Sequence, residues 1–428
     1  MNRKIGKSLA LAGAAALMLA GCSSSSDPEA AGSAAASGGT SASCDADGVL
    51  KLGTILPQTG NLAFLGPPEF AGVDLAVKEI NDAGGVLGED VEVFDGDSGD
   101  TTTNIAVTTA DEQLARGVDA IIGAASSGVS LTFIDKVTGA GVIHFSPANT
   151  SPTFTTYDDN GLYFRTAPSD LFQGAVLAEL AANDGSTKPA VLALQDAYGE
   201  GLANAFTNNF TNAGGSLALD PIIYDPQAAS FEAEVGAVAA ANPDAVVLIG
   251  FEESKKIVQE LIKQGIGPDK VQLYLVDGNL SNTLGDGLPD GILEGTKGTL
   301  PGAQASDEFQ AALLGVDPQL KDFSYAAESY DAVTVIALGA AAAGSDCATE
   351  IAAQLQAVTN DGTVCTDYAD CLAKLEAGED IDYDGQSGPI ALDENGDPAR
   401  ATMGVYVYGA DNQYTANDFI QGDVPSAS

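Results

Sequence analysis

The stretch IIGAASSGVS (residues 121–130) runs from apolar β-branched residues through glycine and alanine into two serines. The apolar part predicts a buried strand, and Ser126 and Ser127 fall where the next helix begins. Ligands of open α/β sheets bind outside the carboxyl ends of the strands. The free N–H groups of a helix start favour an anion, and a serine hydroxyl adds a neutral donor. The stretch is therefore either a carboxylate-binding turn or a serine N-cap that serves only its helix, and local sequence favours the cap.

The same strand-to-helix pattern repeats along the chain. From residue 48, short apolar runs alternate with helical apolar periods, and the alternation restarts after residue 167. Strands are expected at 49–57, 90–97, 118–125, 141–147, 189–196, 217–225, 244–251 and 271–278, and helices at 70–85, 102–116, 129–138, 170–183, 200–212, 231–241, 253–264, 325–343, 348–358 and 367–377. This repetition predicts an α/β fold with parallel sheets in two lobes.

The N-terminus has the features of an export signal. Residues 1–21 begin with three basic residues and continue into an apolar run that is too short to span a membrane. The sequence Leu-Ala-Gly-Cys that ends at Cys22 resembles a bacterial lipobox, so we expect Cys22 to be lipidated; the alternative is an ordinary signal peptide with a chance cysteine. The rest of 22–47 is rich in serine, alanine and glycine and predicts a flexible linker. We therefore expect an extracytoplasmic protein that is held at the membrane by lipid alone.

Composition argues against several functions. There are 17 basic and 60 acidic residues, giving a net charge of −43. Such a surface repels nucleic acid and anionic lipid and suits solubility at high salt. His144 is the only histidine, and its apolar strand indicates a buried structural role. No catalytic or nucleotide-binding motif is placed after a strand, so we expect neither an enzyme nor a cofactor.

One acidic segment allows two interpretations. Asp393, Asn395 and Asp397 have the spacing of calcium ligands, but the later ligands of a calcium loop are missing. Asn395 and Gly396 form a strong hairpin signal. We therefore expect a β-hairpin at 387–409 rather than a metal site.

The cysteines predict disulfides. Apart from Cys22, the chain has Cys44, Cys347, Cys365 and Cys371. An even number in an exported protein indicates two bridges, and four cysteines allow three pairings. The short separation of Cys365 and Cys371 favours that pair, which leaves Cys44 with Cys347. Metal binding is the weaker alternative.

Several segments of the sequence together resemble one protein family. LGTILPQTGNLAFLGPPEFAGVDLAVKEINDAGGVLG, IIGAASSGVS, HFSPANTSPTFT, LYFRTAPSD and DAYGEGLANAF resemble, in order, the type I periplasmic binding proteins that serve branched-chain amino acid ABC transporters. The resemblance implies two Rossmann-like lobes, joined by three crossover strands, that close over a small ligand. It places the first lobe at 48–166 and 300–387, and the second at 167–299 and 388–428.

The resemblance also implies roles for particular residues. Ser127 falls where the family holds the ligand carboxylate, and Thr150 where it contacts both the carboxylate and the ammonium. Ala148 falls where a backbone carbonyl accepts from the ammonium, and Asp277 where an acid pairs with it. The expected side-chain pocket consists of Leu65, Tyr198, Phe251 and Tyr330. Core packing is the alternative for these four residues.

The expected function follows from this set. We expect a monomeric substrate-binding protein that delivers a leucine-, isoleucine- or valine-like amino acid to an ABC permease and its ATPase subunits, without metal or cofactor. A small amide or aromatic acid is an alternative ligand. A ligand-sensing receptor subunit and a surface hydrolase or adhesin are alternative functions.

Overall fold

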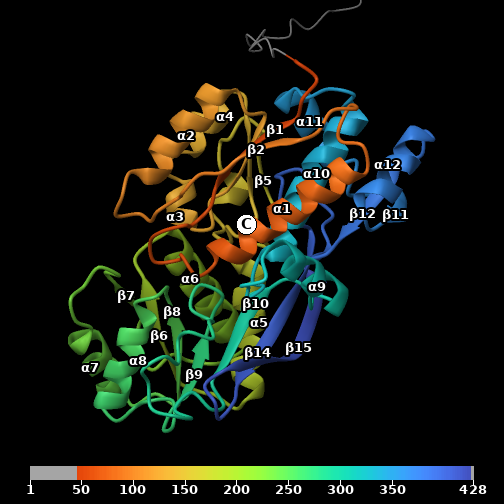
Figure 1. Ribbon diagram of the computed structural model, residues 1–428. Helices are drawn as coiled ribbons and strands as arrows, with labels where there is room; N and C mark the ends of the chain where they lie inside the picture. The colour runs from red at the N-terminus through yellow and green to blue at the C-terminus, as the bar shows by residue number, and fades with distance from the viewer. Residues whose placement is uncertain (1–45, 426–428) are drawn as a thin grey trace, which may run out of the picture. The chain divides into compact units, whose positions relative to one another are not determined.

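The computed structural model describes residues 46–425 (Figure 1). The first lobe contains a five-stranded parallel sheet in the order β2-β1-β3-β4-β5. Its strands are β1 (Lys51–Ile55), β2 (Glu92–Phe94), β3 (Ala120–Gly123), β4 (Ile143–Ser146) and β5 (Tyr163–Arg165). Its helices are α1 (Gly66–Asp82), α2 (Ile105–Arg116), α3 (Ser127–Ser130), α4 (Ile134–Gly139), α10 (Ala326–Ala343), α11 (Ala348–Leu355) and α12 (Tyr368–Glu376), with a 3-10 turn η1 (Phe154–Thr156).

Both faces of this sheet are covered. Ile122 packs into the cluster that includes α1 and α10, whereas Ile121, its neighbour, packs into the cluster with α2 and α4. Successive residues of a strand point to opposite faces, so a continuous apolar run is what a strand buried on both sides requires. The apolar sequence 118–125 therefore gives a central strand.

The second lobe contains a seven-stranded sheet in the order β15-β14-β10-β9-β8-β6-β7. Its strands are β6 (Pro189–Leu194), β7 (Ile222–Tyr224), β8 (Ala245–Ile249), β9 (Gln272–Leu275), β10 (Lys297–Pro301), β14 (Arg400–Tyr408) and β15 (Tyr414–Asp423). Its helices are α5 (Asp170–Asn183), α6 (Ala197–Asn212), α7 (Glu232–Ala241) and α8 (Ser254–Lys263). β6 to β10 are parallel, but β14 is antiparallel to both β10 and β15. The predicted α/β class with two lobes is confirmed, with an antiparallel edge added.

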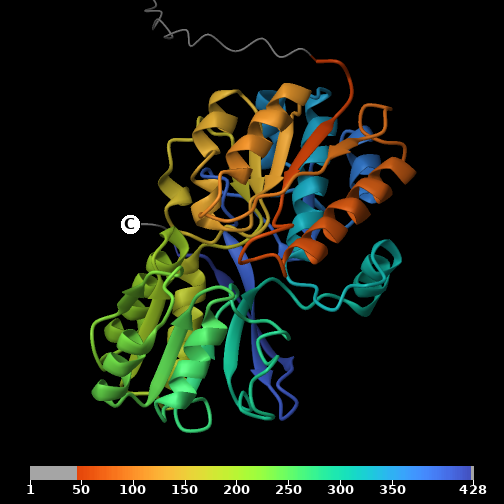
Figure 2. The ribbon, with the colours of Figure 1, turned by 60° about the vertical axis from the view of Figure 1, so that its left-hand side comes forward.

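The chain passes between the two sheets three times (Figure 2). It crosses from β5 to α5, from β10 to α9 (Asp307–Val316), and from β13 (Gly388–Pro389) to β14. β13 belongs to a small sheet with β11 (Thr363–Cys365) and β12 (Ile381–Gly385). The resemblance implied a boundary between residues 387 and 388. Ile390 and Leu392 still pack into the first-lobe core, so the last crossing comes after residue 392.

The hairpin predicted at 387–409 is confirmed only close to its turn, where Leu392 and Pro398 form an antiparallel bridge; its outer arms do not pair with each other. β13 pairs with β12, and β14 pairs with β10 and β15, so the two halves of the expected hairpin belong to different sheets. A tight turn remains at Asn395 and Gly396, where Asp393 Oδ1 accepts from the backbone N–H groups of Asn395 and Asp397. In residues 46–425 no cluster of histidine, cysteine or acidic side chains is placed to hold a metal ion.

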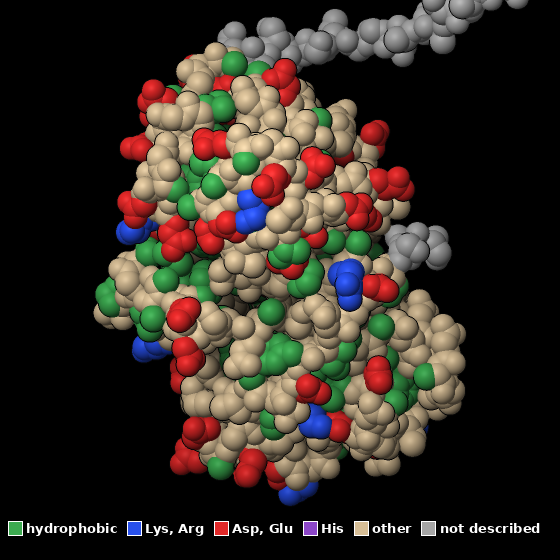
Figure 3. All heavy atoms as spheres, turned by 90° about the vertical axis from the view of Figure 1, so that its right-hand side faces the viewer, with side chains coloured by type: hydrophobic (Ala, Val, Ile, Leu, Met, Phe, Trp, Pro, Cys, Tyr) green, Lys and Arg blue, Asp and Glu red, His purple; other side chains and the backbone are tan. Residues whose placement is uncertain are grey.

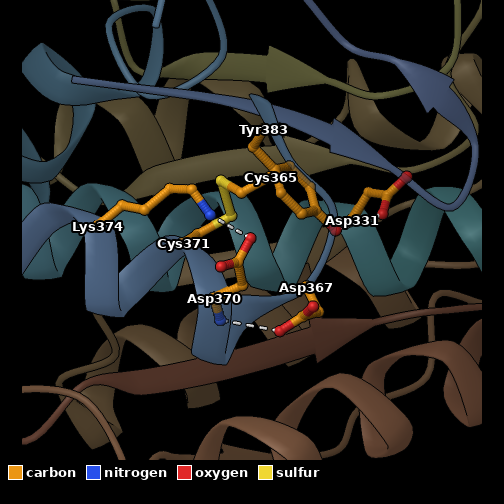
Figure 4. Close-up of a disulfide and its surroundings, with 7 residues drawn as sticks. All are labelled: Asp331, Cys365, Asp367, Asp370, Cys371, Lys374 and Tyr383. Atoms are coloured by element: carbon orange, nitrogen blue, oxygen red, sulfur yellow. Dashed lines mark hydrogen bonds and ion pairs between the residues drawn. A yellow bond between two sulfur atoms is a disulfide. The ribbon is translucent and has the colours of Figure 1, made fainter. Parts of the chain in front are cut away.

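The disulfide between Cys365 and Cys371 is confirmed, with a Cα–Cα distance of 5.4 Å. It joins the end of β11 to α12, beside Tyr383, whose hydroxyl donates to Asp331 (Figure 4). Cys22 and Cys44 lie outside the described residues, as does the signal peptide 1–21. The lipid anchor and the pairing of Cys44 with Cys347 therefore stay predictions.

No single helix in residues 46–425 has both the length and the hydropathy needed to cross a membrane. α10 and α11 satisfy the test only as a pair bent by 105°. Most of α10 is buried in the first-lobe core.

Arg165 fastens the start of the first crossing. Its Nε and Nη2 donate to the two carboxylate oxygens of Asp397 at 2.6 and 2.7 Å, and its Nη1 donates to the carbonyls of Asn149 and Ser151 at 3.2 and 2.9 Å. Both charged side chains are buried. One cation thus connects the end of β5, the loop after β4 and the turn before β14.

We predict that Arg165→Met lowers the free energy of unfolding by about 3–5 kcal/mol, because it leaves the buried carboxylate of Asp397 without a partner. Urea unfolding measures the change. Lys78→Met breaks the exposed pair of Lys78 with Asp82 and should cost less than about 1 kcal/mol. Equal effects of the two substitutions would contradict the structural role of Arg165.

Candidate ligand-binding site

The first wall of the site is the turn that joins β3 to α3. Gly123 has φ +121°, and a Cβ at this position would lie 2.1 Å from the carbonyl oxygen of Ile55, so only glycine fits. Ser126 is the N-cap of α3, and its Oγ accepts from the backbone N–H of Val129 at 3.4 Å. Ser127 is buried, and its Oγ accepts from the backbone N–H of Ser151 at 3.3 Å. The capping role therefore belongs to Ser126, and Ser127 faces the next strand end.

That next strand end, after β4, is tied to the first. Ser146 Oγ donates to the carbonyl of Ala124 at 2.8 Å, and Asn149 Nδ2 donates to the carbonyls of Ala124 and Ala125, both at 2.9 Å. These bonds fix the position of Thr150, which is 1% exposed. Its Oγ1 has no hydrogen-bond partner. A buried hydroxyl of this kind costs free energy unless a ligand satisfies it.

The second wall is centred on Asp277, which follows β9. Its Oδ1 accepts from the hydroxyl of Tyr198 at 2.7 Å and from Gln173 Nε2 at 2.9 Å, and its Oδ2 accepts from the hydroxyl of Tyr325 at 2.7 Å. All three donors are neutral. Burial raises the pKa of Asp277, and these hydrogen bonds oppose the rise. The Tyr198 ring stacks on Phe251 with centroids 5.5 Å apart.

The two walls meet. The backbone N–H of Asp170 in α5 donates to the carbonyl of Thr150 at 2.7 Å, and Ser151 Oγ donates to the carbonyl of Ala197 in α6 at 2.9 Å. Leu65 and Ala148 of the first lobe pack in the same apolar cluster as Tyr198 and Phe251 of the second. The structure thus gathers these predicted residues around one place between the lobes: Leu65, Ser127, Ala148, Thr150, Tyr198, Phe251 and Asp277.

Tyr330 does not join them, which corrects its predicted place. Its hydroxyl donates to Glu79 Oε2 at 2.5 Å, and its ring meets Phe309 edge-on with centroids 5.5 Å apart, inside the first-lobe core. Tyr325 supplies the cleft hydroxyl instead, from the N-cap of α10, with φ 62°. Tyr330 lies on the face of α10 that packs on α1, so its ring cannot reach the site.

Sequence reasoning also missed two polar residues of α5. Asp170 is fully buried, and neither carboxylate oxygen has a hydrogen-bond partner; Gln173 Oε1 also lacks one. Burial raises the pKa of Asp170 well above its ordinary value, and nearby Asp277 raises it further. Ser169, the N-cap, and Asp170 in the first turn look like an ordinary helix start. Only the fold shows that this helix start faces Asp277.

His144 is buried in β4, as its strand predicted. Its Nε2 lies 2.7 Å from the carbonyl oxygen of Gly123, and its ring stacks on Phe133. Burial lowers its pKa to about 3, so the imidazole is neutral at neutral pH. It supports the turn behind the site.

Two α/β lobes that close around buried, unsatisfied polar groups define a binding protein for a small molecule. Residues 49–412 match the sequence profile of the family described as "Periplasmic binding protein", and the chain therefore belongs to this family. It is a family of binding proteins, in agreement with the expectation that the chain is not an enzyme.

Named relatives cover most of the chain. The Leu/Ile/Val-binding protein homolog 1 of Brucella abortus (strain 2308) is 28% identical over 378 residues, which are 86% of this chain and 93% of the relative. The crystal structure of the leucine-binding protein LivK from Thermotoga maritima MSB8 is 26% identical, with a TM-score of 0.70 over 87% of this chain and 98% of LivK. A solute-binding protein of an ABC transporter from R. palustris in complex with 4-hydroxybenzoate is 18% identical, with a TM-score of 0.72 over 88% and 98%, a likeness of fold.

We predict that Asp170→Asn stabilises the ligand-free protein at about pH 7, because an amide at this position avoids the free energy that ionising a buried carboxyl costs. The raised pKa means that Asp170 loses stabilising free energy as the pH rises above about 3.9, its value in the unfolded chain. The difference between variant and parent should therefore disappear near pH 4. Urea unfolding at both pH values measures it.

Asp158→Asn is the matched control, because Asp158 is exposed. It should leave the free energy of unfolding unchanged at both pH values. An Asp170→Asn variant that is no more stable than the parent at neutral pH would contradict the assignment of a buried, unpaired carboxyl.

Proposed function

We propose that this protein is the extracytoplasmic substrate-binding protein of an ABC importer and that it captures an apolar α-amino acid of the leucine, isoleucine or valine type. The observation that carries the proposal is the second wall of the site. Asp277 has only neutral donors, and Asp170 makes no ion pair, so the Thr150 hydroxyl and the more distant charge of Arg165 only partly oppose the rise of its pKa. Buried carboxylates without a cation favour a ligand that brings one, such as an ammonium group.

The first wall supports the other end of an amino acid. Ser127 and Thr150 supply hydroxyls beside the start of α3, and Thr150 Oγ1 is unsatisfied. Neutral donors suit a carboxylate, and the backbone carbonyl of Ala148 suits the ammonium. The charges of an α-amino acid thus match the polarity of both walls.

The apolar part of the site supports an aliphatic side chain. Leu65 and Ala125 lie opposite the stacked rings of Tyr198 and Phe251 in one buried cluster. The relatives described above, a Leu/Ile/Val-binding protein homolog and a leucine-binding protein, agree with this choice. An aromatic acid such as 4-hydroxybenzoate has a carboxylate but no ammonium, so it would leave Asp277 and Asp170 without a cation.

The mechanism is lobe closure. A ligand held by Ser127 and Thr150 on one lobe and by Asp277 on the other has more contacts in the closed state than in the open state, so its binding shifts the population toward closure. Tyr325 strengthens the closed state because it donates to Asp277 from beyond the second crossing. The permease would then receive the ligand from the closed form.

We predict that calorimetric titration with the common amino acids gives tight binding of an aliphatic one. Ser127→Ala should raise its Kd about ten- to a hundredfold, because a charged ligand group loses a hydrogen bond. Asp277→Asn should raise it more than about a hundredfold, because the buried ammonium loses its counter-charge.

Ser126→Ala and Asp290→Asn are the controls. Ser126 caps α3, so its loss should lower stability slightly and leave the Kd unchanged. Asp290 is an exposed acid in the segment after Asp277 and should not affect binding. Binding of sugars alone, or unchanged affinity in both Ser127→Ala and Asp277→Asn, would rule out the proposed ligand and site.

The proposal includes the lipid anchor at Cys22. We predict that the full chain, expressed in a bacterium, sediments with membranes and partitions into detergent, and that Cys22→Ala does neither. An export signal without lipidation would give the same soluble fraction for both proteins. Immunoblots of the membrane and soluble fractions distinguish the two results.

A further inference from the structure

A cavity of about 210 Å³ lies beside the crossing segments and is lined in part by Tyr325, whose hydroxyl donates to Asp277. The side of the molecule that carries α9 and β15 is hollowed between the lobes, and apolar side chains gather around the hollow (Figure 3). Five aromatic rings line the cavity: Phe323, Tyr325, Tyr406, Tyr414 and Phe419. The first two precede α10, and the other three come from β14 and β15.

A buried acid also lines this cavity. Glu328, in the first turn of α10, is 3% exposed, and its Oε1 has no hydrogen-bond partner. Gly302 leaves room for the carboxyl, since a Cβ there would lie 2.3 Å from Glu328 Oε1. Burial raises the pKa of Glu328 to about 8. A cation in the cavity would oppose that rise, because it stabilises the charged carboxylate.

We propose that this hinge cavity is a second binding site and that it takes a small organic cation of the quaternary ammonium class. Aromatic faces attract such cations through the ring quadrupole, and a nearby carboxylate adds the counter-charge. The combination of five rings with one unpartnered acid distinguishes this cavity from an apolar gap, which would favour a neutral ligand. The inference does not depend on the ligand proposed for the cleft.

The walls of the cavity come from both lobes. Tyr406 and Phe419 stand on the second-lobe sheet, whereas Phe323 and Glu328 belong to the segment that enters the first lobe. An occupant would therefore contact both lobes and favour the closed state. Tyr325 lines the cavity with its ring and binds Asp277 with its hydroxyl, so it joins the two sites. The coupling between them is reciprocal by thermodynamic necessity.

One residue of the chain competes for this cavity. Lys321 is exposed at its edge and carries a flexible ammonium. Lys321→Met should therefore strengthen binding of an added cation. The titratable groups that face Glu328 are Tyr325, Lys321 and Asp322 before α10, Asp331 in α10, Glu69 in α1 and Tyr406 in β14. Asp331 raises the pKa of Glu328, and Glu328 in turn raises the pKa of Glu69.

The experiment is a calorimetric titration of the full-length protein with tetramethylammonium chloride, against sodium chloride at constant ionic strength. At about pH 9, one unit above the pKa of Glu328, we expect saturable binding that weakens toward about pH 7. Glu328→Gln should weaken it about tenfold and abolish this pH dependence, and Tyr406→Leu should weaken it several-fold. Glu308→Gln, at an exposed acid of α9, is the control and should bind like the parent.

Three results would overturn the proposal. They are the absence of saturable binding, equal binding of tert-butanol, which has a similar shape and no charge, and unchanged affinity in both Glu328→Gln and Tyr406→Leu. Chemical unfolding of each variant separates lost binding from lost folding. Titration of the parent protein with tetramethylammonium in the absence of any amino acid keeps the two sites apart, since this binding needs no ligand in the cleft and failure of the cleft proposal leaves it intact.

Discussion

The buried negative charge of Asp277 is the constraint on which the site between the lobes depends. A carboxylate in a protein interior needs donors, and three separate elements supply them: α5 through Gln173, α6 through Tyr198, and the segment before α10 through Tyr325. These elements belong to the second lobe and to the chain beyond the second crossing. Satisfying one side chain therefore draws the lobes together, and the donors orient the carboxylate without neutralising it.

Buried acids without ion-pair partners lower the stability of the ligand-free protein. Asp170, Glu69 and Glu328 are buried, have unpartnered oxygens, and have raised pKa values. Arg165, a buried cation nearby, is paired with Asp397 and only partly lowers the pKa of Asp170. A stable scaffold would replace these acids with apolar residues, so their presence is a stability cost that binding can offset. Asp170 lies on α5 of the second lobe, whereas Glu69 and Glu328 lie on α1 and α10 of the first, so both lobes carry part of that cost.

The local sequence was sufficient to predict the elements and residues whose positions depend on local patterns of apolar and polar residues. The helix expected at 170–183 has those bounds, and the polar residues expected at strand ends, Ser127 and Asp277, lie there because parallel strands bring their carboxyl ends to one edge. The predictions that were wrong concern residues whose positions are determined by contacts with residues far away in the sequence. Asn395 and Gly396 make a turn, but Arg165, far away in sequence, determines where it packs. Tyr325 and Tyr330 lie five residues apart at the start of α10, and the sequence does not distinguish them. Only the packing of α10 on α1 decides which of the two faces the cleft.

Tyr325 shows how one residue can carry two functions in such a fold. Its φ of 62° is unusual for a residue with a side chain, and the structure keeps it because the hydroxyl satisfies Asp277 while the ring closes the hinge cavity. A side chain in the middle of a helix would contact only the surface on which that helix packs. The interruption before α10 places the Tyr325 side chain between Asp277 and the hinge cavity, where Glu328 has an unpartnered oxygen. Any group that fills the cleft or the hinge cavity acts on the wall of the other, so the hinge is also part of the binding site.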